Sequence, residues 1–492
     1  MTTPITGTML YDLVQCPHRP TMDLFGDPAK RDETNPFVQL LWEKGNAHER
    51  EVIDSLKLPI VDLSLYLGEE KEQRTLEAMK RGEPLIYSGR ITADDLLGHP
   101  DILRRDGNGY VAGDIKAGAG EFGDGDNTKF KKHYGVQLAL YTDILERLGL
   151  ASSKHPFVWD IDSEEITYDL NEPQGIRNPW TMWEIYEKTL SQARRIAVQT
   201  EETYPAYSEV CKLCHWYTAC LSDLEKSDDL TLIPELGRAK RDVMVDLIPT
   251  VSDLATANID SYISGKKSSF QGIGSGTLRK FHDRAKLAKM KDACAYLTDA
   301  ISLPRAETEL FFDIEVDPTQ GDFCYLHGFV ERHGVDNSTE RYVPFFAEAI
   351  SDEEEERVFA EALRYIGDCQ PCVVYYYSKY ERTIWRKLQS KYPSVCTASD
   401  IEELFSISQS VDLYYDIVKK GTEWPTRDHS IKTLATFLGF RWRDSHPSGA
   451  ASIEWFNHWI QTGDASDKQR ILDYNEDDCV ATRVLLDGIR TL

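Results

Sequence analysis

The stretch ETELFFDIEVD, residues 307–317, is the part of this 492-residue chain that decides the fold of its carboxy-terminal third. Its apolar lead-in and its alternation predict a β-strand in which Asp313 and Glu315 share one face. Strands and helices follow, and the last predicted helix covers residues 468–492. That order of elements predicts an α/β domain with a mixed sheet.

Further acidic residues fall at the far end of the same domain. Tyr474 and Asp478 lie four residues apart and therefore on one helix face. Glu381 follows the apolar strand in CVVYYYSKYERTIW, residues 372–385. Carboxylates that converge on one pocket repel one another unless cations neutralise them, which predicts a two-metal site with ions about 4 Å apart. The alternative is an acidic strand and an acidic helix without a shared pocket.

This pattern resembles the DnaQ-like 3′–5′ exonucleases of the RNase H fold, in the version found in YprB-like proteins. The resemblance implies that Asp313, Glu315 and Asp478 bind the metal ions. It gives Glu381 the role of the second motif, although aspartate is usual there. It implies that Tyr474 orients the attacking water.

Two further residues belong to this hypothesis. Asp477 competes with Asp478 for the last motif, but the spacing Tyr-x-x-x-Asp selects Asp478. Lys432, in SIKTLATFLGF at residues 430–440, fits the helix that precedes the last motif in this group. The alternative for Lys432 is an ordinary surface lysine.

The amino-terminal block, residues 1–225, carries a second acidic pattern. The sequence Asp-Gly-Asn-Gly at residues 106–109 predicts a hairpin turn. In the strand after it, Asp114 and Lys116 share a face, and the hairpin brings Asp101 to the same end of the sheet. Two carboxylates and an ammonium group there can hold a divalent cation and orient a water molecule. The alternative for Asp114 and Lys116 is an exposed ion pair.

In order and spacing, several short motifs of this block resemble the RecB-type nucleases of the PD-(D/E)xK superfamily. The resemblance is closest to the iron–sulfur branch of that superfamily. The motifs are Gly45-x-x-His48, Asp101, Asp114-x-Lys116 and Gln137-x-x-x-Tyr141.

The RecB resemblance assigns a role to each of these residues. It implies that His48, Asp101 and Asp114 bind Mg²⁺ or Mn²⁺, and that Lys116 polarises the water or stabilises developing charge. Gln137 and Tyr141 support the site or contact the nucleic-acid backbone. Asp114 departs from the usual glutamate of the family, and a lone helical histidine such as His48 also has a purely structural alternative.

A cysteine cluster closes the amino-terminal block. Cys211, Cys214 and Cys220 lie within ten residues, and thiolates bind either zinc or an iron–sulfur cluster, with zinc favoured from the residues alone. The iron–sulfur branch has one cysteine before the nuclease core and three after it. The resemblance therefore implies that Cys16 is the fourth ligand of a [4Fe-4S] cluster that staples the domain ends, with zinc as the alternative. A buried small residue is the alternative for Cys16.

The connector, residues 226–299, resembles tandem helix-hairpin-helix units. Gly272, Gly274 and Gly276 are expected to form a turn whose N–H groups approach a phosphate at a helix N-terminus. Lys280 and Arg284 flank that turn as further nucleic-acid contacts. The alternative is a plain helical linker.

The formal net charge of −26 argues against a generally basic DNA-binding surface, but basic residues gather locally at 129–134 and 266–291. No apolar run approaches the roughly 20 residues of a membrane span, and no signal peptide precedes the first block, so a cytoplasmic protein with no membrane partner is expected. No phosphate-binding loop of the ATPase type is present, and unwinding would therefore need a separate helicase or ATPase.

Taken together, these patterns predict an α/β multidomain protein. A restriction-endonuclease-like α/β core with an Fe-S clasp is expected at 1–225, a helical hairpin connector at 226–299 and an RNase H-like DEDD exonuclease domain at 300–492. The expected function is metal-dependent hydrolysis of DNA, single-stranded or at ends, in repair, recombination or defence. The alternatives are an RNA-directed exonuclease, a catalytically degenerate nucleic-acid-binding scaffold and an iron–sulfur redox carrier.

Overall fold

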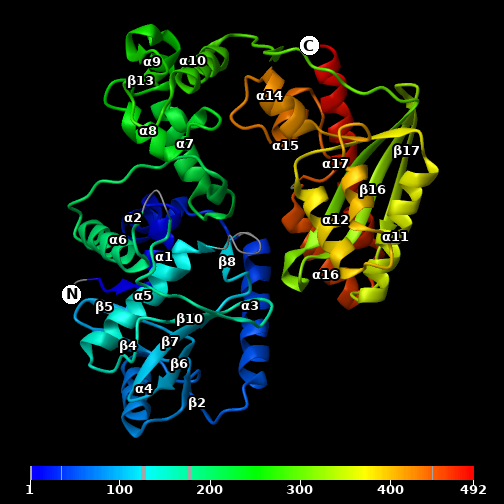
Figure 1. Cartoon of the computed structure of the whole chain (residues 1–492). Helices are drawn as coiled ribbons and strands as arrows, with labels where there is room; N and C mark the ends of the chain where they lie inside the picture. Colours follow the sequence, from blue (N-terminus) through cyan, green and yellow to red (C-terminus); the bar gives the residue numbers. More distant parts are fainter. Residues whose placement is uncertain (1–2, 35, 123–128, 176–178, 446) are drawn as a thin grey trace. The chain divides into compact units, whose positions relative to one another are not determined.

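The computed structural model describes the chain except residues 1–2, 35, 123–128, 176–178 and 446. The chain divides into two compact units (Figure 1). The first comprises Met1–Pro205 and Glu209–Leu221, and the second comprises Ala206–Ser208 and Ser222–Leu492. No helix in the described ranges is both long enough and apolar enough to cross a membrane.

A six-stranded sheet forms the centre of the first unit, in the order β11-β10-β7-β6-β3-β2. Its strands are β2 (Ile60–Asp62), β3 (Leu85–Tyr87), β6 (Ile102–Asp106), β7 (Gly109–Ile115), β10 (Phe157–Trp159) and β11 (Glu165–Thr167). β6 and β7 form an antiparallel hairpin in which Asp106 pairs with Gly109, so the turn predicted at residues 106–109 is confirmed. β10 runs parallel to β7.

The two faces of β7 enter two different cores. Tyr110 and Ala112 pack on the side of α1 (Gly7–Gln15), α5 (Lys132–Arg147) and α6 (Met182–Ala197), as members of one apolar cluster. Val111 and Ile115 face the other way, towards α3 (Pro36–Ser55). Because side chains alternate along a strand, Asp114 faces the same side as Tyr110 and Ala112, towards α5.

Shorter elements complete the first unit. They are β1 (Ile5–Thr6), α2 (His18–Phe25), α4 (Gly68–Arg81), β4 (Ile91–Ala93), β5 (Leu96–Gly98), β8 (Glu121–Phe122), β9 (Lys129–Phe130) and, across the unit boundary, α7 (Tyr217–Ser227). β1, β5 and β4 form a separate three-stranded sheet.

The second unit contains a five-stranded sheet in the order β17-β16-β15-β18-β19. Its strands are β15 (Thr308–Asp317), β16 (Phe323–His333), β17 (Asp336–Phe346), β18 (Cys372–Tyr376) and β19 (Ser410–Asp412). β15 pairs antiparallel with β16 and parallel with β18. The mixed sheet predicted for this part of the chain is therefore confirmed.

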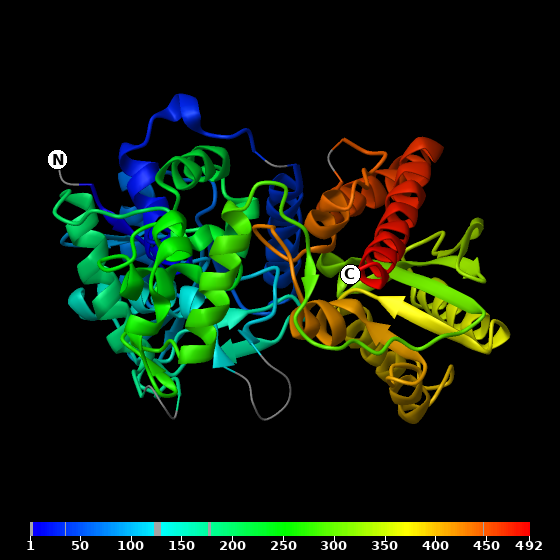
Figure 2. The same cartoon turned by 90° about the horizontal axis from the view of Figure 1, so that it is seen from above.

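Helices cover both faces of this sheet (Figures 1 and 2). Leu310, Phe312 and Ile314 of β15 pack with α11 (Asp352–Asp368), α12 (Tyr380–Lys391) and α13 (Ala398–Leu404). Phe311 faces the opposite side, where α15 (Ile431–Phe437) and α17 (Ala465–Arg490) pack. The alternation of β15 therefore directs Asp313 and Glu315 to the α17 side.

The predicted connector has an apolar core of its own, composed of residues between Leu230 and Ala285. Its elements are α8 (Gly237–Met244), α9 (Val251–Thr256), β12 (Ile263–Ser264), β13 (Lys267–Ser268) and α10 (Ser275–Lys289). Near the end of the predicted connector, β14 (Tyr296–Leu297) pairs with β20 (Thr422–Glu423), which attaches this end of the connector to the carboxy-terminal domain.

Candidate functional site

Three carboxylates from two elements meet on the α17 side of the carboxy-terminal sheet. Asp313, Glu315 and Asp478 each offer an oxygen, and these oxygens all lie within 4.8 Å of one another. The first two come from one face of β15 and the third from the middle of α17. We call these three residues the acidic triad. Carboxylate oxygens grouped in this way are the ligands that Mg²⁺ and Mn²⁺ prefer.

Neutral side chains fix the orientation of the triad. Asn475 Nδ2 donates to Asp313 Oδ2 at 2.8 Å, and Trp442 Nε1 donates to Asp478 Oδ1 at 2.7 Å. Gly328 of β16 lies opposite Asp313 in the strand register, and a Cβ there would lie 1.6 Å from the side-chain oxygen of Asn475. A larger residue at position 328 would therefore displace Asn475 from the place in which it bonds Asp313.

Burial and mutual repulsion both act on these acids. Burial, followed by the charges of Asp478, Glu315 and Glu381, raises the pKa of Asp313 well above its usual range. Burial and the charge of Asp478 raise the pKa of Glu315 to about 8. A bound cation would reverse both effects, because it stabilises the ionised form of each carboxylate.

Glu381 adds a fourth carboxylate from the first turn of α12. It is buried, and its Oε2 has no hydrogen-bond partner in the described part of the chain. Burial raises its pKa well above the usual range, and the charges of Asp412 and Asp478 act in the same direction. A buried carboxylate oxygen without a donor is costly, so its environment fits a cation.

Tyr474 and Lys432 border the triad. Lys432 Nζ donates to Tyr474 Oη at 2.7 Å and lies 3.8 Å from Asp478 Oδ2. Burial, followed by the charge of Asp478, raises the pKa of Tyr474 well above its usual range. The Tyr474 hydroxyl is therefore protonated at neutral pH and is held between an ammonium group and a carboxylate.

Asp477, the competitor of Asp478, is occupied elsewhere. Its carboxylate accepts hydrogen bonds from the backbone N–H of Arg443 at 2.8 Å and from Arg443 Nε at 2.9 Å. The triad contains Asp478 and not Asp477, which is the choice that the Tyr-x-x-x-Asp spacing favoured.

Sequence reasoning missed Asn475 and Trp442. Asn475 lies three residues before Asp478, and positions three apart share a helix face, so the helical period was an available signal. No sequence pattern links Trp442 to Asp478, because the contact joins a loop to a helix 36 residues away.

The amino-terminal unit brings Asp101 and Asp114 together across the β6–β7 hairpin. Asp114 Oδ1 accepts a hydrogen bond of 3.4 Å from the backbone N–H of Asp101, and Asp101 Oδ2 accepts one of 2.8 Å from Ile115. Lys116 Nζ lies 2.9 Å from Asp114 Oδ2. This acidic pair therefore has an ammonium group from the protein beside it.

Electrostatics in this second centre involve the same groups. Burial, followed by the charge of Asp114, raises the pKa of Asp101 well above its usual range. Burial by itself would lower the pKa of Lys116, but the charges of Asp114 and Asp101 outweigh it and raise that pKa. Lys116 is therefore a charged group at neutral pH.

The helix α5 supplies the neighbours that the RecB resemblance implied. Gln137 Nε2 donates to Tyr141 Oη at 2.8 Å, and Tyr141 Oη donates to the backbone carbonyl of His99 at 3.2 Å. Burial and then the charges of Asp114 and Asp101 raise the pKa of Tyr141 well above its usual range. The structure thus brings Tyr141 next to the acidic pair, with Gln137 holding its hydroxyl.

His48 has a different partner. Its Nε2 lies 2.7 Å from the backbone oxygen of Asp160. Among the described residues, the ligand atoms of His48, Asp101 and Asp114 do not form a group within 4.8 Å of one another, as those of the acidic triad do. The next residue, Glu49, is close enough to Asp101 to raise the pKa of that carboxyl. Sequence reasoning missed Glu49, and metal ligation by His48 stays a prediction.

The cysteines lie where the chain returns to its start. Burial raises the pKa of the Cys214 thiol, and the nearby Cys16 and Cys211 act in the same direction. Asp23 Oδ1 lies 2.7 Å from His215 Nε2 and accepts a bond of 2.8 Å from Trp216 Nε1. Cys220 follows in the first turns of α7. The amino-terminal segment and residues 211–220 are thus joined by direct contacts.

The connector residues have distinct positions. Gly274 is the N-cap of α10, Gly272 has φ of +77°, and Gly276 lies in the first turn of the helix. Lys280 Nζ lies 3.4 Å from Glu235 Oε2. Arg284 is buried and donates to Glu423 Oε2 at 2.7 Å. In this structure Arg284 therefore joins the connector to the carboxy-terminal domain, and its buried guanidinium is not presented to solvent.

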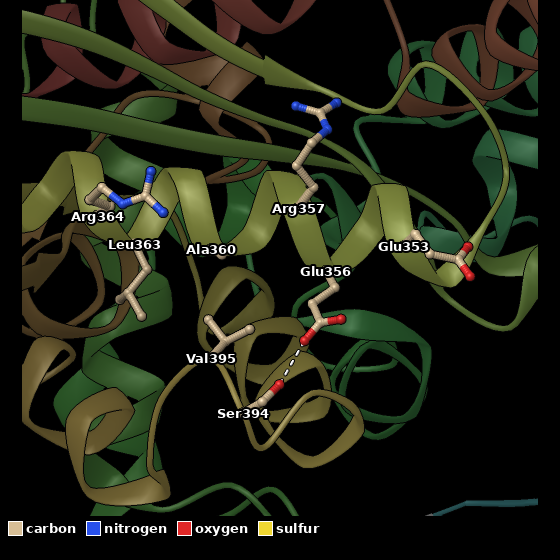
Figure 3. A pocket seen from close by; sticks show the side chains of 8 residues that line it. All are labelled: Glu353, Glu356, Arg357, Ala360, Leu363, Arg364, Ser394 and Val395. Carbon is tan, nitrogen blue, oxygen red and sulfur yellow. Dashed lines mark hydrogen bonds between the residues drawn. The ribbon is translucent and has the colours of Figure 1, made fainter.

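A shallow depression lies elsewhere on the carboxy-terminal domain, between α11 and residues 394–395 (Figure 3). Glu353, Glu356, Arg357 and Arg364 line it, and Ser394 Oγ donates to Glu356 Oε1 at 2.7 Å. No residue of either acidic centre lines it. We therefore assign the site to the acidic triad and not to this depression.

Comparison with known proteins agrees with the carboxy-terminal geometry. Residues 310–489 match the family model described as the RNase_H superfamily. No curated protein matches the chain. The carboxy-terminal domain is therefore RNase H-like, and the match indicates a nuclease-like, metal-dependent phosphodiester hydrolase. RNase H-like nucleases use divalent metals, and the acidic triad supplies suitable ligands.

Proposed function

We propose that this protein is a divalent-metal-dependent nuclease that hydrolyses phosphodiester bonds of DNA, in single strands or at ends. The single observation that carries the proposal is the acidic triad, inside a domain that matches the RNase_H superfamily. The buried Glu381 beside it, with an oxygen that has no donor among the described residues, supports a site for positive charge.

In the carboxy-terminal centre, Asp313, Glu315 and Asp478 hold the cations, with Glu381 at the second position. When bound, such cations act as Lewis acids and lower the pKa of water. Tyr474, held by Lys432, orients the attacking water. Lys432 contributes a positive charge near the scissile phosphate, and Asn475 and Trp442 keep two triad carboxylates in place.

We propose a second hydrolytic centre of the RecB type in the first unit. Asp101 and Asp114 hold a cation there, and Lys116 stabilises the negative charge that develops on the phosphate. The geometry of the hairpin and the raised pKa of Lys116 support this role. Gln137 and Tyr141 support the site or contact the nucleic-acid backbone, and His48 and Glu49 are the candidate ligands from α3.

The four cysteines are proposed to bind a [4Fe-4S] cluster, with zinc as the alternative. The influence of both Cys16 and Cys211 on the Cys214 thiol supports a thiolate site that closes the first unit. An absorption spectrum of anaerobically purified protein separates the two metals, because zinc is colourless. Cys16→Ser is expected to abolish the visible absorption and to lower the thermal stability of the first unit only.

The role in repair, recombination or defence, and a separate helicase as partner, are also proposals. The turn at Gly272, Gly274 and Gly276 is proposed to bind phosphates without sequence preference, with Lys280 beside it. RNA is the alternative substrate for the carboxy-terminal centre, since one fold serves different substrates.

Cleavage of end-labelled single-stranded DNA with Mg²⁺ or Mn²⁺ tests the proposal. Asp313→Ala and Asp114→Ala, made separately, assign the activity to one centre or the other. Asp368→Ala and Asp54→Ala are matched controls, because both aspartates are exposed and lie in the same two units. Binding without cleavage by the wild type would contradict the nuclease and support a scaffold. Cleavage of RNA but not of DNA would show that the substrate is RNA, the alternative named above.

A further inference from the structure

Two lysines and a tyrosine form a small basic and aromatic surface near the carboxy-terminal centre. Lys379 Nζ lies 4.4 Å from the centroid of the Tyr415 ring, and Lys419 Nζ lies 5.1 Å from it. Both lysines are exposed and the tyrosine is partly exposed. We call these three residues the platform.

The charge of the platform is not balanced locally. In the part of the chain that the structure describes, neither ammonium group has an ion-pair partner, whereas the neighbouring Lys420 pairs with Asp416 at 3.0 Å. The chain as a whole carries a net charge of −26. Unpaired ammonium groups in so acidic a protein are therefore available to an anionic partner, such as the phosphates of a nucleic acid.

The backbone around Tyr415 is unusual. Residues Leu413–Val418 form a π-helix, a rare conformation that is frequent at functional sites. The carboxylate of Asp412 accepts the backbone N–H groups of Tyr414 at 3.0 Å, Tyr415 at 2.9 Å and Ser378 at 3.1 Å. Ser378 has φ of +89°, which is costly for a residue with a side chain. One buried carboxylate therefore holds both chain segments of the platform in place.

The platform adjoins the metal centre through the same residues. Lys379 is the N-cap of α12, and Glu381 follows two residues later. Glu381 interacts electrostatically with both Asp412 and Asp478. The two chain segments of the platform are therefore held by Asp412 and lead into α12, the helix that carries the carboxylate beside the acidic triad.

We propose that the platform binds the unpaired part of the nucleic-acid substrate, with a base stacked on Tyr415 and phosphates on Lys379 and Lys419. This inference rests on the proposed nuclease function and names the residues outside the acidic triad that would contact the unpaired strand. A base in a duplex is already stacked on its neighbours, whereas an unpaired base offers its face to an aromatic ring. In the free protein the two ammonium groups lie over the Tyr415 ring. When a base stacks on the ring, the lysine side chains move aside and bind the phosphates.

Photocrosslinking of the full chain tests the contact directly. Oligonucleotides that carry 5-iodouracil, as DNA in one arm and RNA in the other, are irradiated with the protein in EDTA, where metal-dependent hydrolysis cannot occur. We expect a crosslink to the peptide that contains Tyr415 with single strands of at least one sugar type, and its loss with the same sequence in a blunt duplex. Crosslinks confined to other peptides, or equal with the duplex, would overturn the proposal.

Kinetics of the Asp313-dependent cleavage provide the second test. Tyr415→Ala is expected to raise KM about tenfold for single strands, since stacking on one aromatic ring contributes about 1–3 kcal/mol, with kcat changed less than about twofold. Tyr415→Phe keeps the ring and should restore the wild-type KM. The double variant Lys379→Ala, Lys419→Ala should raise KM and flatten its dependence on salt.

Lys468→Ala is the matched control, because Lys468 also lies over aromatic rings of the same domain but pairs with Glu348. An unchanged KM in Tyr415→Ala, or equal defects in Tyr415→Phe and Tyr415→Ala, would contradict stacking. The two proposals fail separately. A protein that crosslinks at Tyr415 but cuts nothing loses the nuclease function, whereas one that cuts through Asp313 without that crosslink loses the platform.

Discussion

The two acidic centres differ in where their positive charge comes from. In the first unit, Lys116 Nζ lies 2.9 Å from Asp114 Oδ2, and Lys116 directly follows the strand that carries this acid. In the second unit, the ammonium group of Lys432 lies 3.8 Å from one oxygen of Asp478, and Glu381 has an oxygen without a donor in the described residues. The amino-terminal pair thus has an ammonium group in direct contact with one acid, whereas the ammonium group nearest the carboxy-terminal acids is farther away and leaves Glu381 without a donor among the described residues.

The largest expected effect concerns the proposed metal ligand Asp313. Asp313→Ala removes a ligand that no other group replaces, so cleavage assigned to the carboxy-terminal centre should fall on the order of 10³-fold or more. Asp477→Asn is the control, because Asp477 is next to Asp478 in the sequence but bonds Arg443. This variant should keep most of the activity. Rates with labelled single strands measure both variants. Equal losses would show that the triad is not the metal site.

Removal of the Lys116 ammonium group is the corresponding test in the first unit. Lys116→Met leaves Asp101 and Asp114 facing each other without an ammonium group, and breaking a buried ion pair costs about 3 kcal/mol. We expect a clearly lower melting temperature at neutral pH and loss of Asp114-dependent cleavage. Acidification should recover part of the stability, because protonation relieves the repulsion. A melting temperature like that of the wild type at all pH values would contradict this account.

The stability of the metal-free protein should depend on pH through Glu315. The folded-state pKa of Glu315 is raised from 4.5 to about 8 by burial and Asp478. A carboxyl with a raised pKa binds its proton more tightly when folded, so its stabilising contribution is present below pH 4.5 and is lost as the pH rises to about 8. In EDTA at pH 8, Glu315→Gln should therefore melt about 5 °C or more above the wild type.

Added Mg²⁺ should reverse that order of stability. At pH 8 it is expected to raise the melting temperature of the wild type and to have a smaller effect on Glu315→Gln, which has lost a charged ligand. At pH 4.5 the two proteins should melt alike in EDTA. Calorimetry across this range measures the difference, and a gap that does not depend on pH would contradict the assignment.

The smallest expected effect concerns Lys432. Lys432→Met removes a bond to Tyr474 but no metal ligand, and loss of such a supporting contact costs about 10- to 100-fold in activity or metal affinity. Lys420→Met is the matched control, because Lys420 is exposed and pairs with Asp416. A loss as large as that of Asp313→Ala would mean that Lys432 acts in the chemical step itself.

Local patterns were enough for much of the fold. The alternation of β15 and the turn at residues 106–109 both agree with the sequence. Each depends on interactions between residues close in the chain, which the residue types express directly. The same is true of the Tyr474 and Asp478 spacing on α17.

Contacts between segments that are distant in the chain could not be predicted from local sequence patterns. The bond from Trp442 to Asp478, the burial of Arg284 against Glu423 and the proximity of Glu49 to Asp101 each join different elements. His48 bonds the backbone oxygen of Asp160, which no local pattern indicates. Such contacts depend on how helices and loops pack on the sheets.

Which acids share a face follows from the amino-acid order alone, because strand and helix periods are properties of the local backbone. This order places Asp313 with Glu315 and Tyr474 with Asp478. Only the tertiary structure decided that the acids of β15 and α17 meet within 4.8 Å, since that distance depends on the packing of α17 against the sheet. It also decided that Gly328 makes room for the asparagine that holds Asp313.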